Sequence, residues 1–239
     1  MTVLGIHQPG YFPWMGFFKK MINSEVFVFL DDSLFVKNNF YNRNKIKIFS
    51  GETMLTVPVF SHNDTLLKDV KIDNTQKWKK KHKKSILLNY SKTKYFKDFS
   101  FFFENLFDKN FTYLIDLNME IINFIMKQLD IKTKTLFSSE LEISQNSSDR
   151  ILEICKAVKT DYYLTGTTWA RQNLKINDFK KYKINVEFQE FQHPKYFQVN
   201  GEFIPFMSTI DLLFNEGKDN SKKILRDSII KKEIITYSD

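Results

Sequence analysis

The sequence predicts an α/β fold, in which flanking helices and a helical insertion surround a mostly parallel β-sheet. Residues 3–6 and 25–30 are short apolar runs, and an amphipathic run at residues 16–23 separates them. A strand, a helix and a second strand within about thirty residues form a βαβ unit, whose strands are parallel with a right-handed crossover. Between residues 118 and 191, helix-like and strand-like segments alternate again, which is typical of α/β proteins.

Length and composition fit one large domain in the cytoplasm. The chain has 239 residues, of which 42% are hydrophobic, and this is enough for one sizeable core. The single cysteine, Cys155, lies in an apolar helical pattern, so we expect a buried structural residue and no disulfide. We find no signal peptide and no transmembrane segment, and we therefore predict a cytoplasmic protein.

The net charge of +8 favours anionic small molecules as partners. The chain has 32 lysines and only 4 arginines, whereas a surface selected to bind phosphates usually contains more arginine. We therefore expect no nucleic-acid binding, although the charge can attract an anionic ligand. The rare arginines Arg43, Arg150 and Arg171 stand out against this composition.

The turn after the first strand, residues 7–16, is the first candidate site. A turn needs Gly or Pro for its backbone, but it has no need of His7, Gln8, Tyr11 and Trp14. Open α/β sheets bind ligands at the carboxyl ends of their strands, so we assign His7 as catalytic and Gln8, Tyr11 and Trp14 as substrate-binding. The alternative for the aromatic residues is that they close the end of a core.

A pair of carboxylates follows the second strand. Asp31 and Asp32 come directly after residues 25–30 and should lie on the same sheet edge as His7. We expect Asp32 to be catalytic by orienting His7, and Asp31 to bind substrate. Adjacent carboxylates point to opposite faces of a strand, so at most one could bind Mg²⁺ directly, and we predict no metal site.

Two further polar groups are candidates for substrate binding. Asn42, Arg43 and Asn44 precede a hairpin that turns at Gly51-Glu52, and they offer a planar donor fork for phosphate or carboxylate. His82 lies on a helical stripe with Trp78. A solvated loop is the alternative for the first group, and a satisfied half-buried histidine is the alternative for the second.

The domain organisation follows from the remaining pattern. We predict a single α/β domain at residues 1–217, with a helical insertion at about residues 65–130 that covers the pocket, and a charged C-terminal tail at residues 218–239. Residues 166–172 are expected to form a loop at a strand end. Ser208 and Asp211 are expected to cap the last helix, which Gly217 ends.

Together these blocks resemble the WbqC-like family of bacterial surface-polysaccharide loci. The matching residues run from 3 to 217 and are His7-Gln8-Pro9-Gly10-Tyr11-Phe12-Pro13-Trp14-Met15-Gly16, Phe29-Leu30-Asp31-Asp32, Asn42-Arg43-Asn44, Leu55-Thr56-Val57-Pro58-Val59, Trp78, His82, Tyr90, Tyr163-Leu164, Gly166, Pro194, Tyr196, Gln198, Ser208, Ile210-Asp211-Leu212-Leu213-Phe214-Asn215 and Gly217. The resemblance implies a role in the biosynthesis of O-antigen, the lipopolysaccharide side chain, or of a related glycan. We add Gly166 and Asn215 to the substrate-binding residues. The segment 167–173 departs from the aromatic-rich version expected of the family.

The first strand, turn and helix are also similar to the start of the HIGH-type nucleotidylyltransferases, so a HUP-like core is an open alternative. Those enzymes hold a triphosphate with histidines at a helix N-terminus. Gly16 aligns with the glycine of that motif, but Trp14 and Phe17 occupy the histidine positions. The fold analogy can hold without that activity.

Three functions stay open from the sequence. The first is a transferase that modifies a nucleotide-linked amino sugar by N-acyl or aminoacyl transfer, with His7 as general base. Its partners would be a nucleotide sugar and an acyl or aminoacyl donor. The others are a nucleotidylyltransferase and a non-catalytic module that binds sugar nucleotides or glycans. The sequence identifies no cofactor, and it does not name the sugar.

Overall fold

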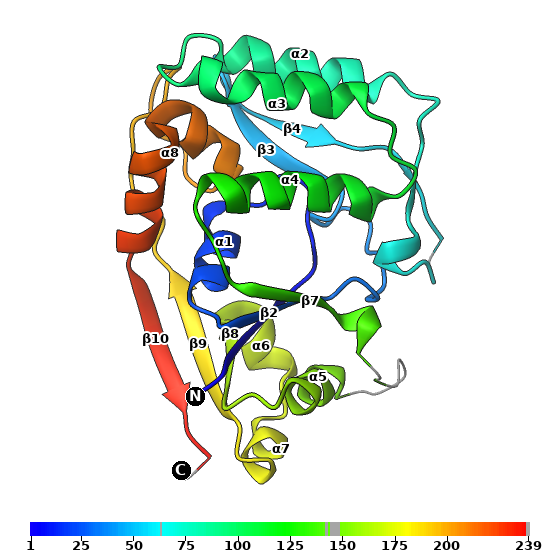
Figure 1. The fold of residues 1–239 in the computed structure, drawn as a ribbon, viewed down its shortest axis with the longest axis vertical. Helices are drawn as coiled ribbons and strands as arrows, with labels where there is room; N and C mark the ends of the chain where they lie inside the picture. Colours follow the sequence, from blue (N-terminus) through cyan, green and yellow to red (C-terminus); the bar gives the residue numbers. More distant parts are fainter. Residues whose placement is uncertain (63, 142, 144–148, 238–239) are drawn as a thin grey trace.

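The computed structural model describes residues 1–62, 64–141, 143 and 149–237, and it confirms an α/β fold with a mostly parallel sheet (Figure 1). Six strands form the sheet in the order β10-β9-β8-β1-β2-β7, and only β10 is antiparallel to its neighbour. The strands are β1 (Val3–His7), β2 (Val26–Phe29), β7 (Lys134–Phe137), β8 (Tyr162–Gly166), β9 (Asn185–Phe191) and β10 (Ile230–Ile235).

The chain order in this sheet reverses beside β1. The chain proceeds from β1 through β2 to β7 on one side, and β8, β9 and β10 then extend the sheet on the other side. The loops after β1 and β8 therefore leave the sheet in different directions. In open α/β sheets a ligand crevice forms at this switch point, outside the carboxyl ends of the strands.

Helices cover both faces of the sheet and produce two hydrophobic cores. On one face, α1 (Met15–Ile22) and α8 (Thr209–Asp227) join the insertion in a large aromatic core. On the other face, α5 (Arg150–Val158), α6 (Thr167–Asn173) and α7 (Ile176–Lys181) pack around a smaller core that contains the buried Cys155. No helix in the described part of the chain is long and apolar enough to cross a membrane.

One segment differs from the expected loop. Residues 166–172 were assigned to a loop from the sequence, but Thr167–Asn173 forms helix α6. The segment contains no Gly or Pro after Gly166, and Ala170 is buried against the smaller core. Because the segment has no residue that breaks a helix, packing of Ala170 against the core is sufficient to favour a short helix.

The insertion lies between β2 and β7 and begins with a hairpin. It contains β3 (Arg43–Ile48), β4 (Gly51–Thr56), β5 (Val59–Phe60), η1 (Leu67–Asp69), β6 (Lys71–Ile72), α2 (Trp78–Tyr90), α3 (Phe96–Asp108) and α4 (Leu114–Gln128), and η2 (Ser138–Glu140) follows β7. The helices α2 and α3 lie far from the sheet strands, at the top of Figure 1. The Phe-rich face of α3 packs into the large core with α1 and α8, and α2 contributes Trp78, Ile86 and Tyr90 to the same core.

The predicted charged tail is instead part of the fold. Gly217 adopts φ 72° and ψ 176° and interrupts α8, but the helix resumes and continues to Asp227. The strand β10 then pairs with β9 along six residues. Lys19 of α1 fixes this segment, because its Nζ donates to the carbonyls of Leu225 (3.1 Å) and Arg226 (2.6 Å). Exposed lysines on β10 suit an edge strand, because they discourage pairing with another chain.

We predict that Gly217→Ala destabilises the protein more than Gly201→Ala. Both glycines have positive φ, but only at Gly217 would a Cβ meet a neighbour, 2.6 Å from the Tyr95 ring. The left-handed conformation alone should cost about 1–2 kcal/mol, and the contact should raise the total at Gly217 to about 2–4 kcal/mol. Urea unfolding of both variants measures the difference. Equal free energies of unfolding would show that the Tyr95 contact contributes nothing.

Candidate functional site

A cavity of about 1210 Å³ lies at the switch point of the sheet. Residues at the carboxyl ends of three strands line it: His7 at the end of β1 and Gln8 after it, Thr165 and Gly166 at the end of β8, and Glu190 near the end of β9. The first part of the insertion and α5 to α7 provide the other walls. The position agrees with the rule for ligand binding in open α/β sheets, so this cavity is the candidate site.

His7 is open to the cavity and has a fixed hydrogen bond. Its Nδ1 lies 2.9 Å from the carbonyl oxygen of Gln8 and must donate to it, which leaves Nε2 as an acceptor. The ring is exposed to water in the cavity, yet surrounding protein atoms enclose it. This enclosure, and then the nearby charge of Lys20, lower the pKa of His7 from 6.5 to about 4, although the Gln8 carbonyl opposes the shift. His7 is therefore neutral near pH 7 and has a small driving force for taking a proton.

An aromatic wall flanks His7. The Trp14 ring packs edge-on against Phe191 (5.4 Å between ring centroids) and Phe206 (5.6 Å). A Cβ at Gly16 would collide with the Trp14 indole, so glycine is needed for this ring position. Phe40 and Phe206 both line the cavity and are about half exposed, at 52% and 54%. These faces are available to a ligand with a planar base or an apolar sugar face.

The cavity also contains charged groups that the sequence reasoning missed. Lys20, Lys175, Asp178 and Glu190 line it, although none was assigned to the site. A signal for Lys20 was present, because it follows Gly16 by four residues on α1 and therefore shares its helix face. The other three lie on segments that the sequence reasoning left without a site.

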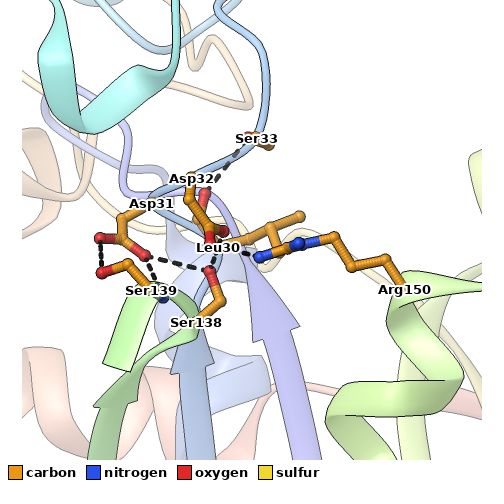
Figure 2. A network of polar contacts seen from close by, with 7 residues as sticks. All are labelled: Leu30, Asp31, Asp32, Ser33, Ser138, Ser139 and Arg150. Atoms are coloured by element: carbon orange, nitrogen blue, oxygen red, sulfur yellow. Dashed lines mark hydrogen bonds and ion pairs between the residues drawn. The ribbon is translucent and has the colours of Figure 1, made fainter. Parts of the chain in front are cut away.

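Asp31 and Asp32 lie outside the cavity lining, in a buried network (Figure 2). Asp31 accepts hydrogen bonds from the backbone N–H (3.0 Å) and the hydroxyl (2.6 Å) of Ser139. Asp32 forms an ion pair with Arg150 and contacts the Ser138 hydroxyl. The network joins the end of β2 to η2 and α5, so the two carboxylates hold the sheet edge together. Arg150 does line the cavity, and it is the route by which Asp32 can affect a ligand.

Three other predicted site residues bond only within the protein. The Tyr11 hydroxyl lies 2.9 Å from Nδ1 of His82, and both side chains are buried in the large core. Burial, followed by the charge of Lys81, lowers the pKa of His82 to about 4. Asn42 is also buried and donates to the Val57 carbonyl at 2.8 Å.

The remaining predicted residues divide between the cavity and the core. Asn44 lines the cavity and also donates to the Phe12 carbonyl at 2.8 Å. Arg43 bonds to Asn38 and is absent from the cavity lining. Both are in strand β3, so they belong to the hairpin rather than preceding it. Asn215 is buried and joins the Val199 N–H (2.9 Å) to the Asp211 carbonyl (2.7 Å).

The predicted capping box of α8 is absent. Ser208 occupies the N-cap position, but its hydroxyl has no hydrogen-bond partner within the described residues. The Asp211 carboxylate instead accepts hydrogen bonds from Tyr90 (2.9 Å), Tyr196 (2.8 Å) and Gln198 (2.8 Å). Burial raises the pKa of Asp211, and these donors oppose that shift. This second polar network stabilises the core rather than the cavity.

Within the described residues, no group of three or more His, Cys, Asp and Glu side chains is arranged to hold a metal ion.

A comparison with protein families matches residues 8–223 to the WbqC-like protein family. The chain belongs to the WbqC-like protein family. The matched region includes the opening turn, the insertion, β7 to β9 and most of α8, and β10 lies beyond it.

This WbqC-like protein is also similar to a protein of Mycobacterium tuberculosis (strain ATCC 25618 / H37Rv) described as "Uncharacterized protein Rv1507c". The two are 29% identical over 223 residues, which cover 92% of this chain and 96% of the relative. No solved structure matches the chain significantly. The family match thus establishes membership, whereas the chemistry must be argued from the cavity.

We predict that Asp32→Asn destabilises the protein, because it leaves the Arg150 guanidinium without its charge partner. The side chain of Asp32 is 3% exposed and that of Arg150 is 15% exposed. Removing one partner of a pair this buried should cost about 2–4 kcal/mol in urea unfolding. The double variant Asp32→Asn/Arg150→Gln should recover part of the loss. Additive losses in the double-mutant cycle would show that the pair has no coupling.

We also predict that Lys20→Met raises the pKa of His7. The Lys20 charge is one of the two causes that lower the His7 pKa to about 4, so removing it should move the titration toward neutral pH. NMR titration of the His7 ring measures the shift. Lys175→Met is the control, because Lys175 lines the same cavity from another segment and is not among the causes of the shift. Equal His7 titrations in both variants would contradict the coupling.

Proposed function

We propose that this WbqC-like protein is a transferase that modifies a nucleotide-linked amino sugar by N-acyl or aminoacyl transfer. Its pathway would be the biosynthesis of O-antigen or a related glycan of lipopolysaccharide. The observation that carries the proposal is the cavity between β1 and β8, because it combines an aromatic wall, a neutral histidine and a lysine that pairs with no carboxylate among the described residues. The family match supports the glycan context by resemblance alone.

The cavity has the size and the surfaces that a nucleotide sugar requires. Its volume of about 1210 Å³ exceeds the roughly 300–1,000 Å³ typical of small-molecule sites, so a nucleotide, a sugar and part of a second substrate can enter. Phe40 and Phe206 offer faces for stacking on the base or the sugar. Lys20 and Lys175 offer positive charge for a diphosphate.

The chemistry needs a base beside the acceptor amine. In N-acyl transfer, the amine nitrogen attacks the carbonyl carbon of the donor, a C–N bond forms, the bond to the leaving group breaks, and the amine loses a proton. His7 is the general base that the sequence favours, but its pKa of about 4 makes it a weak base. Its free Nε2 can accept a hydrogen bond from that amine and thereby orient it. Gln8 and Asn44 provide amide groups on the same wall of the cavity, and the pair of Asp32 and Arg150 borders it.

Nucleotidyl transfer on a HUP-like core is the second candidate. The order of the strands and the turn between β1 and α1 favour it, because dinucleotide-binding folds share the same reversal of chain order beside the first strand. Against it, Trp14 forms the cavity wall and Phe17 packs into the aromatic core, so the triphosphate-binding histidines of the HIGH motif have no counterpart at these positions. The third candidate function is a non-catalytic module that binds sugar nucleotides or glycans.

We predict that the protein binds nucleotide-linked amino sugars and acylates them. The test is a panel of uridine- and thymidine-diphosphate amino sugars, each combined with acyl and aminoacyl donors and followed by mass spectrometry. His7→Gln should lower kcat by about 10²-fold or more if His7 takes part in proton transfer, whereas Trp14→Leu should mainly raise KM. Phe101→Leu is the matched control, because Phe101 is an exposed aromatic residue of α3, outside the cavity.

Each result selects one function. Acylated product supports the transferase, and pyrophosphate release from nucleoside triphosphates would support nucleotidyl transfer instead. Tight binding of sugar nucleotides without turnover across the donor panel would support the binding module. Wild-type activity in His7→Gln would contradict the role of His7.

A further inference from the structure

Lys20 is placed in the cavity by helix α1 and held there by one backbone acceptor. Its Nζ donates to the carbonyl oxygen of Ile6 at 2.7 Å, and Ile6 is the residue before His7 in β1. Lys20 and His7 both line the cavity at the switch point. The amine therefore lies where a ligand bound at the carboxyl end of β1 would meet it.

The Lys20 amine forms no ion pair with any carboxylate in the described part of the chain. Among the described residues, no Asp or Glu lies within ion-pair distance of Lys20. The group that faces it from β1 is His7, and the acids that line the cavity come from other elements: Asp149 before α5, Asp178 of α7 and Glu190 of β9. Lys19, Arg150 and Lys175 also line the cavity. A different set, Asp227 of α8 and Lys232 of β10, acts on the neighbouring Lys19.

Comparison with the other buried lysines shows why Lys20 is different. Lys19 and Lys47 also donate to backbone carbonyls, and burial lowers the pKa of both. Negative charge opposes that shift, from Asp227 at Lys19 and from Asp211 with Glu202 at Lys47. For Lys20, burial is the cause of the shift, and it lowers the pKa from 10.5 to about 7. A substantial fraction of the Lys20 side chains is therefore neutral near pH 7, which suits an amine that must take a proton.

We propose that the ε-amino group of Lys20 is the proton acceptor of this cavity and takes the proton from the ammonium group of the amino-sugar substrate. This inference rests on the proposed function and names a catalytic residue for it. The neutral Lys20 amine gains a proton, and the substrate ammonium becomes a free amine. The nitrogen of that amine forms a C–N bond to the carbonyl carbon of the acyl donor, and the bond from this carbon to the leaving group breaks. The leaving group departs with the electron pair of that bond and takes the second proton of the attacking nitrogen. His7 stays neutral and orients the substrate amine through Nε2.

The electrostatic interaction between His7 and Lys20 favours Lys20 as the group that takes the proton. Protonation of His7 would place a second positive charge beside Lys20, and this repulsion is one cause of the low His7 pKa. Lys20 can take the proton at neutral pH at less cost. The proton then converts Lys20 into a cation, which can stabilise negative charge on a bound diphosphate or on the departing group.

The first experiment tests the amine without a substrate. Trace labelling with isotopic acetic anhydride at pH 5 to 11, followed by peptide mass spectrometry, gives the titration midpoint of each lysine in the full-length wild-type protein. We expect a midpoint near pH 7 for Lys20, well below the midpoints of the exposed lysines of the same protein, which serve as internal controls. A midpoint above pH 9 for Lys20 overturns the inference and leaves the proposed function standing.

The second experiment separates a base from an anion-binding cation. Arginine keeps the positive charge but does not give up its proton near neutral pH. If Lys20 is the base, Lys20→Arg should bind the nucleotide-linked amino sugar within about threefold of wild type and lose about 10²-fold or more in kcat. If Lys20 only binds phosphate, Lys20→Arg should keep its kcat and Lys20→Met should lose binding, and this result overturns the inference.

The pH profile provides a readout that a structural role would not change. In the wild type, kcat should rise as the pH increases through the labelling midpoint of Lys20, because only the neutral amine accepts the proton. In Lys20→Arg this limb should disappear, and circular dichroism checks that the variant is folded. Failure of every amino sugar to bind or react would refute the proposed function and the base role with it, whereas the labelling midpoint is measured independently of both.

Discussion

The backbone of the opening turn is buried, and its carbonyl groups must therefore find hydrogen-bond donors inside the protein. Pro9 to Pro13 form neither helix nor strand, and Tyr11 and Phe12 are completely buried. A buried carbonyl without a donor costs about 1–3 kcal/mol. Asn118 donates to Pro9 (3.1 Å), Asn44 donates to Phe12 (2.8 Å), and Thr209 donates to Pro13 through its hydroxyl (2.8 Å). These three donors come from α4, β3 and α8, so the turn fixes the relative positions of elements that are far apart in the sequence.

This arrangement explains the role of the insertion. Its helices were expected to cover the pocket, but the cavity is lined by the segment around residues 33–44 and not by α2, α3 or α4. The helices instead support the turn from behind, through Asn118 and the contact between Tyr11 and His82. The hydrogen bonds of Asp211 connect helix α2 of the insertion, through Tyr90, to α8 and to the segment around Tyr196. Much of the family pattern therefore preserves the position of the turn, and only part of it lies on the cavity.

The sequence was sufficient to predict the βαβ unit, the alternation of helices and strands, and the place of His7 and Gln8 at the carboxyl end of the first strand. Trp14, Asn44 and Gly166, which are also candidates from the sequence, line the same cavity. These predictions depend on local patterns and on the direction of parallel strands. It was insufficient for Tyr11, His82, Asn42 and Asn215, because a polar residue that satisfies a buried backbone group has the same identity as one that binds a ligand. The helical and strand structure of the C-terminal tail could not be predicted either. It depends on the hydrogen bond from Lys19 to the end of α8, and these residues are more than 200 positions apart in the sequence.

The positions of the acids determine the electrostatic character of the cavity. A reading of the sequence puts Asp31 and Asp32 beside His7, where they would neutralise Lys20 and hold it as a stable ammonium. In the structure, Ser138, Ser139 and Arg150 hold both carboxylates in a separate network (Figure 2). Within the residues that the structure describes, Lys20 therefore has the Ile6 carbonyl as its hydrogen-bond partner and His7 as its titratable neighbour, whose protonated form it disfavours. At this strand end the imidazole of His7 stays neutral, and the amine of Lys20, with a pKa of about 7, can accept a proton from a substrate. The network around Asp32 keeps both carboxylates out of the cavity and thereby maintains this condition.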